Sequence, residues 1–265
     1  MNNRIHFPTS TPIREYATCT WEVRNLRGLS ETILPKGSME IIFNFSRSVK
    51  SQFPSHALPE QAPRCFIQGI HTEPLQVSYS DDQHLLGICI QPHRVQSLLG
   101  IPASELINSR VDLTLIDTRF DRLWNQLQTL TLFEQKIQLI EQTLPLLDPA
   151  SCARTQRLSQ LFLSKEIACF ESVDKLARDV CYSTRQLNRV SHSLFGLSAE
   201  ALIIYKKFMH AVNLIHQGDT TLTNIAYGSG FYDQAHLCRT FKSFTGMTAK
   251  HYKNQKSELP FHIFS

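Results

Sequence analysis

The sequence predicts an α+β protein in three parts: a β-rich domain at residues 1–119, a helical linker at 120–154 and an all-α domain at 155–256. Three observations lead to this division. Short apolar runs between turn residues fill the first part, apolar residues recur at helical spacing in the second, and short helical segments make up the third. At 265 residues the chain has room for two modest domains, because domains typically contain about 100 to 200 residues.

The β-rich part contains four clear strand signals. They are MEIIFNF at 39–45, RCFIQGI at 64–70, LQVSYS at 75–80 and HLLGICI at 84–90. Short strands bounded by turn residues are typical of a small β-barrel or a β-sandwich.

The linker has a broad apolar face. In residues 120–147, the apolar side chains at helical spacing are Leu123, Leu127, Leu130, Phe133, Ile137 and Ile140. This face is too extensive for an isolated helix, so it packs either on the β-rich domain or on a second subunit. We expect the second arrangement, a homodimer. The DPASCAR segment at 148–154 is predicted to be a connection, because Asp148-Pro149 interrupts the helix.

The last part is helical almost throughout. Its segments are TQRLSQLFLSK, SVDKLARDV, STRQLNRVSHSLF, AEALIIYKKFMHAVNLIHQ, TLTNIAYGS and DQAHLCRTFKSFT. Gly196, Gly218 and Gly230 mark three of the connections between them. This many short helices in one stretch predict a compact all-α domain.

Charge is concentrated at the C-terminal end. Residues 161–256 contain 12 Lys and Arg against 7 Asp and Glu, whereas residues 1–160 contain 15 of each class. The positive part suits a polyanion, although a solvated helical surface would have the same composition.

Cysteine usage and hydropathy indicate the compartment. The seven cysteines, at positions 19, 65, 89, 152, 169, 181 and 238, include no C-x-x-C pair and are odd in number, so they predict neither a disulfide framework nor a zinc site. The N-terminus lacks the apolar core of a signal peptide, and there is no apolar run of about 18 residues. We therefore expect a cytoplasmic protein with no membrane partner.

Two stretches of the all-α part share one skeleton. They are LARDVCYSTRQLNRVSHSLFG at 176–196 and IAYGSGFYDQAHLCRTFKSFTG at 225–246. In each, an aliphatic residue and alanine are followed by an aromatic residue, then Leu-x-Arg, then a glycine seven residues after the arginine. Each copy fits a helix-turn-helix, at about 174–196 and about 222–246, with Ser183 or Asp233 capping the second helix.

The second helix of each copy has an apolar face and a polar face. The apolar residues are Leu187, Val190 and Leu194 in the first copy, and Leu237, Phe241 and Phe244 in the second. The outward residues are Thr184, Arg185, Asn188, Arg189 and His192, and Gln234, Ala235, His236, Cys238, Arg239 and Lys242. Arginine can hold guanine through two hydrogen bonds, and asparagine or glutamine can hold adenine in the same way. A generic α-bundle also exposes polar residues, but two matching copies joined by one helix favour recognition of double-stranded DNA.

The stretch IAYGSGFYDQAHLCRTFKSFTGMTAKHY resembles the second helix-turn-helix of the AraC/XylS family of bacterial transcription regulators, whose pattern runs I-A-x-x-x-G-F-x-D-Q-x-H-F-x-R-x-F-K-x-x-x-G-x-T-P-x-x-Y. The resemblance covers about residues 157–255, including the first copy and the helix KKFMHAVNLI between the two. It implies that two recognition helices enter successive major grooves about 34 Å apart on one face of DNA. The implied base contacts are Arg185, Asn188, Arg189, Gln234, His236, Cys238 and Arg239, and the implied phosphate contacts are Thr184 and Lys242. RNA polymerase is a further partner on this resemblance.

Four positions depart from the family pattern. Ala249 takes the place of the proline after the last Gly-x-Thr, and Leu237 takes the place of a phenylalanine. In the first copy, Ser191 stands where the family has phenylalanine, and Cys181 stands where it has a small glycine. The last two changes predict a less tightly packed first unit.

The N-terminal part resembles the cupin-like sensor domain found in one branch of the family. The residues that carry this resemblance are PKGSMEIIFNF, CFIQGIHTEPLQV and LLGICIQPHRVQSLLGIPASELINSRVDL. It implies a small cupin-like β-barrel that is controlled by a small-molecule effector or by a partner, with the identity of the ligand left open. Metal-binding cupins use His-x-His, a glutamate and a later histidine, a spacing that His71-Thr72-Glu73, His84 and His93 do not match. We therefore expect no metal, no cofactor and no catalytic residues.

Three functional hypotheses remain open from the sequence. The first is a transcription regulator controlled by a ligand or partner. The second is a constitutive DNA-binding protein whose N-terminal domain only dimerises. The third is an enzyme with a DNA-binding appendage, which the missing metal pattern disfavours. The effector, the operator and the direction of regulation are not predicted.

Overall fold

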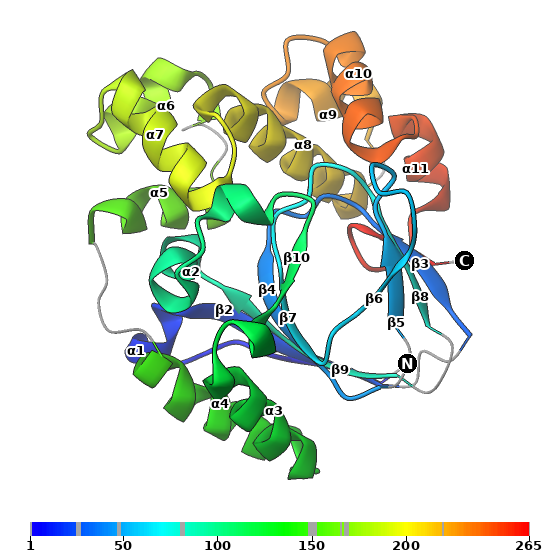
Figure 1. The fold of residues 1–265 in the computed structure, drawn as a ribbon. Helices are drawn as coiled ribbons and strands as arrows, with labels where there is room; N and C mark the ends of the chain where they lie inside the picture. The colour runs from blue at the N-terminus through cyan, green and yellow to red at the C-terminus, as the bar shows by residue number, and fades with distance from the viewer. Residues whose placement is uncertain are drawn as a thin grey trace.

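A computed structural model describes residues 2–24, 28–46, 49–79, 83–147, 153–164, 166, 170–218 and 220–264. It confirms the α+β class, with a strand-rich N-terminal part and a helical C-terminal part (Figure 1). Across these ranges, none of the helices combines the length and the apolar character needed to span a lipid bilayer.

The strands form two antiparallel sheets whose inner faces line one cavity. The first sheet has the order β1 (Asn2–His6), β2 (Ala17–Arg24), β9 (His84–Ile90), β4 (Met39–Asn44), β7 (Cys65–Gln68) and β10 (Arg110–Asp112). The second has the order β11 (His262–Phe264), β3 (Ser30–Ile33), β8 (Leu75–Tyr79), β5 (Val49–Gln52) and β6 (Glu60–Gln61). The four predicted strands correspond to β4, β7, β8 and β9. Among the described residues the strands make a two-sheet sandwich and do not close into the single barrel that the resemblance implies.

Side chains alternate across the first sheet and give it two different faces. Along β2, Cys19, Trp21 and Val23 line the space between the sheets, whereas Glu22 points to the helices on the other side. Gly87 on β9 lies opposite Trp21, and a Cβ atom at this glycine would be 2.1 Å from the indole. Glycine therefore makes room for the aromatic ring inside the sandwich.

The predicted helix at 120–147 is in fact two helices, α3 (Thr118–Thr129) and α4 (Phe133–Leu147). The backbone of Leu130 is extended, with φ −85° and ψ 128°, so α3 cannot continue through it. The apolar side chains pack within the chain's own core: Phe120, Leu123, Leu127, Phe133, Ile137, Ile140 and Leu144 are all buried. The face that led us to expect a dimer is thus covered within one chain. Residues 148–152 of the predicted connection lie outside the described residues.

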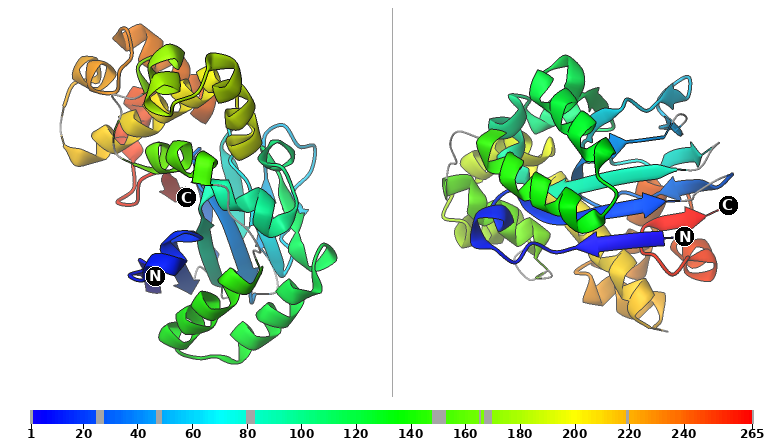
Figure 2. Two further views of the ribbon diagram at one scale, coloured as in Figure 1. Left: turned by 90° about the vertical axis from the view of Figure 1, so that its left-hand side faces the viewer. Right: turned by 90° about the horizontal axis from the view of Figure 1, so that it is seen from below.

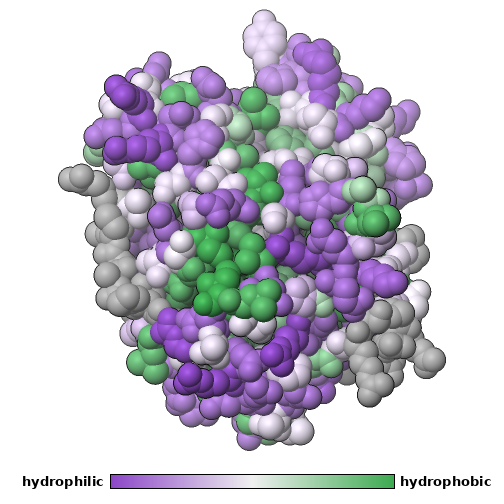
Figure 3. All heavy atoms as spheres, in the orientation of Figure 1, coloured by the Kyte–Doolittle hydropathy of each residue, from purple (hydrophilic) through white to green (hydrophobic). Residues whose placement is uncertain are grey.

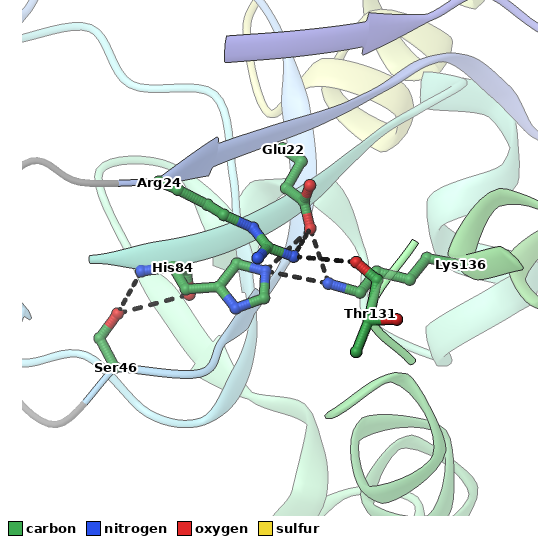
Figure 4. A network of polar contacts seen from close by, with 6 residues as sticks. All are labelled: Glu22, Arg24, Ser46, His84, Thr131 and Lys136. Carbon is green, nitrogen blue, oxygen red and sulfur yellow. Dashed lines mark hydrogen bonds and ion pairs between the residues drawn. The ribbon is translucent and has the colours of Figure 1, made fainter. Parts of the chain in front are cut away.

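A buried ion pair joins α4 to the first sheet (Figure 4). Lys136 Nζ lies 2.6 Å from Glu22 Oε1 and 2.9 Å from His84 Nε2. Arg24 donates to the same glutamate oxygen at 3.1 Å. Burial works to raise the pKa of Glu22, but hydrogen bonds from the three partners outweigh it and hold the pKa at about 2. This network fixes α4 against β2 and β9.

Short helices complete the N-terminal part: α1 (Thr11–Arg14), α2 (Pro92–Leu99) and the 3-10 helices η1 (Ala103–Leu106) and η2 (Leu113–Leu115). The C-terminal part contains α5 (Ala153–Leu163), α6 (Val173–Asp179), α7 (Thr184–Phe195), α8 (Ala199–Gln217), α9 (Leu222–Gly228), α10 (Gln234–Thr245) and α11 (Ala249–Gln255). Six of these match the predicted segments, and α11 was not predicted.

After α11 the chain returns to the N-terminal part. Strand β11 pairs with β3 at the edge of the second sheet, and Leu34 N donates to Phe261 O at 2.8 Å. Figure 2 shows that the two termini consequently lie on the same side of the molecule. The C-terminal end of the helical part is therefore built into the sandwich.

Candidate nucleic-acid interface and internal cavity

The two predicted helix-turn-helix units have the same turn. Tyr182 N donates to Ala177 O at 2.8 Å in the first unit, and Phe231 N donates to Ala226 O at 2.9 Å in the second. Both alanines are buried, which allows the two helices of each unit to approach closely. The residue before each aromatic has a left-handed backbone, with φ 56° at Cys181 and φ 76° at its counterpart Gly230. The repeat seen in the sequence is thus a repeat of structure.

Both recognition helices begin and end at defined caps. Ser183 forms a capping box with Gln186 at the start of α7, and Asp233 accepts a hydrogen bond of 2.6 Å from His236 N at the start of α10. The predicted caps are confirmed. The helices end at Gly196 and Gly246, whose φ angles are 70° and 71°.

Helix α7 presents its predicted polar face to solvent. Thr184, Arg185 and Arg189 are exposed, and the surface over α6 and α7 is mostly hydrophilic (Figure 3). Asn188 is also exposed, but its Oδ1 accepts a hydrogen bond of 3.0 Å from Ala199 N at the start of α8. Its amide nitrogen is the atom that remains to contact a base.

Helix α10 presents a similar face. Arg239 and Lys242 are exposed, while Cys238 is half-buried. Gln234 is exposed, but its Oε1 accepts a hydrogen bond of 2.7 Å from Thr223 on α9. His236 is half-buried, with its ring centroid 5.2 Å from that of Phe231. Arg239 and Lys242 are therefore the two side chains of this face best placed to move onto DNA.

Two aromatic residues beside α10 were missed by the sequence analysis. Tyr232 is 85% exposed next to the capping Asp233, and Tyr227 on α9 is 63% exposed. Tyrosine hydroxyls are common donors to DNA phosphates. The available signal was the position of Tyr232, which directly precedes the N-cap of the recognition helix.

The first unit differs from the second in its packing. Ser191 is fully buried at the position equivalent to Phe241, and among the described residues its hydroxyl has no hydrogen-bond partner. The end of α7 packs closely on the N-terminal domain, because a Cβ at Gly196 would lie 2.5 Å from Ile107 and 2.9 Å from Ala103 O. Ser193 Oγ donates to Gln96 on α2 at 3.1 Å. The first unit is thus docked on the N-terminal domain.

Helix α8 separates the two units, with α7 and α10 near its opposite sides in Figure 1. It also contacts the N-terminal domain through a fully buried tyrosine. Tyr205 Oη donates to His71 O at 2.8 Å and accepts from Gly37 N at 3.0 Å. The segment at residue 37 can approach α8 closely because this residue is glycine. A Cβ atom there would lie 2.4 Å from Met209 Sδ on α8.

The space between the two sheets is a cavity of about 370 Å³. Most of its wall is apolar, with side chains from Trp21, Val23, Ile33, Ile42, Phe66, Leu75, Val77 and Leu85. Cavities of this size and character are typical of small-molecule sites.

Polar groups gather in one region of the wall. Lys36 Nζ lies 2.9 Å from Glu40 Oε1, and Glu31 accepts hydrogen bonds from Tyr79 and from His262 Nδ1, the latter at 2.7 Å. Burial raises the pKa of Glu40, but the charge of Lys36 together with hydrogen bonds from Lys36, Ser38 and Cys89 outweighs this, and the net pKa is lowered. Glu31, Lys36 and Glu40 thus already have partners, which leaves the apolar wall as the dominant feature for a ligand.

Histidine and metal chemistry are limited in this cavity. Burial lowers the pKa of His71 to about 4, so its imidazole is neutral at pH 7. Its Nδ1 is occupied by Glu73 O at 2.8 Å. In the parts of the chain that the structure describes, no three His, Cys, Asp or Glu side chains converge as a metal site would require.

The cavity is closed in part by the C-terminal end of the chain. Leu259, His262 and Phe264 line it. Phe261 N donates to Tyr252 Oη on α11 at 3.3 Å, and the Tyr252 ring lies 5.5 Å from that of Phe241 on α10. A continuous series of contacts thus leads from the cavity wall to the second recognition helix.

Comparison with known proteins agrees with this two-part organisation. Residues 5–112 match a family described as "Domain of unknown function (DUF6597)", and residues 176–255 match one described as "Helix-turn-helix domain". No curated protein sequence matches the chain.

Some solved structures are similar to the chain at low identity. ToxT from Vibrio cholerae is 11% identical, with 89% of this chain and 97% of that chain covered and a TM-score of 0.48. A ToxT structure with a bound unsaturated fatty acid is 14% identical, with 90% and 97% covered and a TM-score of 0.48. The AraC-like transcriptional activator CuxR is 12% identical, with 72% and 80% covered and a TM-score of 0.27.

Proposed function

We propose that the chain is a DNA-binding transcriptional regulator of the AraC family, and that a small molecule held in its N-terminal cavity controls how the two recognition helices meet DNA. The observation that carries this proposal is the position of β11. This strand follows the second helix-turn-helix in the chain, yet it forms part of the cavity wall. A molecule that fills the cavity therefore contacts a strand that is covalently joined to the DNA-binding part.

The recognition surface in this proposal consists of the outward faces of α7 and α10. The base contacts are Arg185, Asn188, Arg189, Gln234, His236, Cys238 and Arg239, and Thr184 and Lys242 contact phosphates. Exposure of the three arginines and of Lys242 supports the assignment. The internal hydrogen bonds of Asn188 and Gln234 make these two side chains the weaker contributors.

The effector that suits the cavity is a small and mainly apolar molecule with one polar group. The apolar wall supplies most of the contact area, and Glu31, Glu40 and Lys36 supply the polar region. Binding acts through two links to the DNA-binding part. One is β11 with Tyr252, and the other is the hydrogen bond from Tyr205 to the carbonyl oxygen of His71.

A thermal-shift panel of apolar metabolites on the full chain tests this proposal. A compound that raises the melting temperature should also change the affinity for a DNA site selected from random sequence. Phe264→Ala should weaken the thermal shift, because Phe264 lines the cavity. Ile263→Ala is the matched control: it lies on the same strand but packs on the main core. It should change the shift much less.

The alternative is a constitutive DNA-binding protein whose N-terminal domain only dimerises. It predicts that a compound can bind the cavity at saturation without any change in DNA affinity. That result would overturn effector control while leaving the DNA interface intact.

Homodimerisation remains part of the proposal. Its original reason, the apolar face of residues 120–147, no longer applies because this face of α3 and α4 packs against the core of the same chain. Sedimentation at micromolar concentration decides the point, and a monomer that still binds two successive grooves would remove the dimer from the proposal. RNA polymerase is a further proposed partner, tested by transcription from a template that carries the selected site.

A further inference from the structure

Two cysteines face each other across the first sheet at the cavity wall. Cys19 on β2 and Cys89 on β9 are direct partners in the antiparallel register, and both line the cavity. The Cα atoms of such partners are about 4.5 or 5.5 Å apart, and a disulfide spans either distance. Strand pairing thus places the two thiols where a bond between them can form without a change of register.

The two thiols already interact. The hydrogen bond from Cys89 lowers the pKa of the Cys19 thiol more than burial raises it. Cys89 Sγ also lies 3.4 Å from Glu40 Oε1. Cys19 is therefore the better nucleophile, because the thiolate is the reactive form of cysteine. Cys65 on β7 is a contrast: it is fully buried, and burial raises the pKa of its thiol.

We propose that Cys19 and Cys89 form a reversible oxidation site, in which a hydroperoxide that enters the cavity converts the two thiols to a disulfide. The thiolate of Cys19 attacks one peroxide oxygen and the O–O bond breaks. This gives a sulfenic acid on Cys19 and, after protonation, water or an alcohol. The thiol of Cys89 then attacks the sulfenic sulfur, the S–S bond forms and water leaves. The two sulfurs lose two electrons in total, and the peroxide gains them.

The disulfide changes the polar region of the cavity. It removes the S–H group that faces Glu40, whose carboxylate is paired with Lys36 at 2.9 Å. It also ties β2 to β9 covalently. Disulfides in a reducing compartment are usually transient and serve catalysis or redox sensing, which fits a pair whose thiols are free in the structure. This response to an oxidant goes beyond the proposed effector control and does not rest on it.

Peptide mapping of the oxidised full chain tests the site. Native protein is treated with hydrogen peroxide, alkylated to block free thiols, digested with trypsin without reduction and analysed by tandem mass spectrometry. The expected product links the peptide 15–24, which contains Cys19, to the peptide 65–94, with the bond at Cys89 and not at Cys65. The mass of the linked product is two hydrogens lower than the sum of the two thiol peptides, and reduction with dithiothreitol restores both thiols.

Two serine variants define the order of attack. In Cys89→Ser, the sulfenic acid on Cys19 should persist and be trapped by dimedone, whereas in Cys19→Ser the thiol of Cys89 should stay alkylable. Circular dichroism confirms that each variant is folded, and the mapping of the native chain needs neither variant. The proposal is wrong if Cys19 and Cys89 remain alkylable when exposed Cys181 is oxidised. It is also wrong if either cysteine pairs mainly with another partner.

Discussion

Replacement of Lys136 by methionine tests the network that holds α4 on the first sheet. The side chain of Lys136 is fully buried, and that of its partner Glu22 is 2% exposed. Methionine keeps much of the length of the side chain but removes the ammonium group. The carboxylate then stays in its buried site with one donor fewer.

The magnitude follows from the pKa of Glu22, which is about 2 in the folded chain against an ordinary 4.5. At about 1.4 kcal/mol per pKa unit, the three partners, less the opposing effect of burial, stabilise the ionised form by roughly 3.5 kcal/mol. Burial lowers the pKa of Lys136 despite its pairing, so the ammonium gains less from the pair than the carboxylate does. Removal of one partner of a buried pair typically costs about 3 to 5 kcal/mol. We expect Lys136→Met to lower the free energy of unfolding by about 2 to 4 kcal/mol at pH 7.

Urea denaturation at several pH values measures this loss. The folded-state pKa of Glu22 lies below its unfolded value, so the network stabilises the fold fully above pH 4.5 and loses its effect as the pH falls from 4.5 to about 2. The difference between parent and variant should shrink over the same range. Lys175→Met, at a partly exposed lysine 3.9 Å from Glu171, is the control and should change stability by less than about 0.5 kcal/mol.

The double variant Glu22→Gln with Lys136→Met completes the cycle. It should lose less stability than the sum of the two single variants, because neither charge is left alone in the core. Additive losses, or a Lys136→Met variant that unfolds at the same urea concentration as the parent, would refute this account of the network.

The DNA-binding domain gives three further expectations. Arg239→Ala should weaken binding to the preferred site by about 1 to 3 kcal/mol and relax discrimination at one base pair. Lys242→Ala should weaken binding to all duplexes equally. Arg185→Ala should lower the affinity for the preferred site less than Arg239→Ala does. Titration of single-base-changed duplexes measures these effects, and an Arg239→Ala variant that binds every duplex like the parent would show that α10 does not read bases. Affinity should fall with salt at a log–log slope of about −5 for six phosphate contacts, and a flat dependence would contradict a phosphate interface. In thermal melts, Gly230→Ala should destabilise the fold by about 1 kcal/mol, because residue 230 has a φ of 76°. Cys181→Gly should leave the stability unchanged or raise it, because residue 181 has a φ of 56°. Equal losses of stability in the two variants would show that backbone strain is not the cause.

The helices of the DNA-binding domain could be predicted because their signals are local. Ser183 and Asp233 supply side-chain caps at the start of the recognition helices, and Gly196 and Gly246 supply the left-handed residue at the end. Helical spacing of apolar residues fills the interval between these signals. The start and the end of each recognition helix are thus determined by residues in the helix or next to it.

The cavity and its cysteine pair could not be predicted because they depend on register between distant strands. Nothing near Cys19 in the sequence indicates that β2 pairs with β9, or that the pairing sets Cys19 opposite Cys89. The pairing of strand β11 is even harder to predict, because its partner β3 lies at a sheet edge that exists only in the folded sandwich. The division of 120–147 into two helices is another non-local result, because each half packs separately on the core.

Helix α8 limits how an effector can act on DNA binding. Its Phe208 ring lies 5.4 Å from Phe241 of α10, while its Tyr205 is hydrogen-bonded into the N-terminal domain. Between them, Lys206 donates to Phe162 O at 2.5 Å, and burial lowers the pKa of this lysine to about 8. A helix packed on several sides moves between discrete arrangements and does not bend by degrees. A ligand shifts such an equilibrium only if it binds one arrangement better than the other. The proposed effector must therefore contact groups whose partners differ between such arrangements. In the described part of the cavity wall, the end of the chain at β11, the segment at His71 and the segment at Lys36 and Gly37 are linked by hydrogen bonds to the DNA-binding domain.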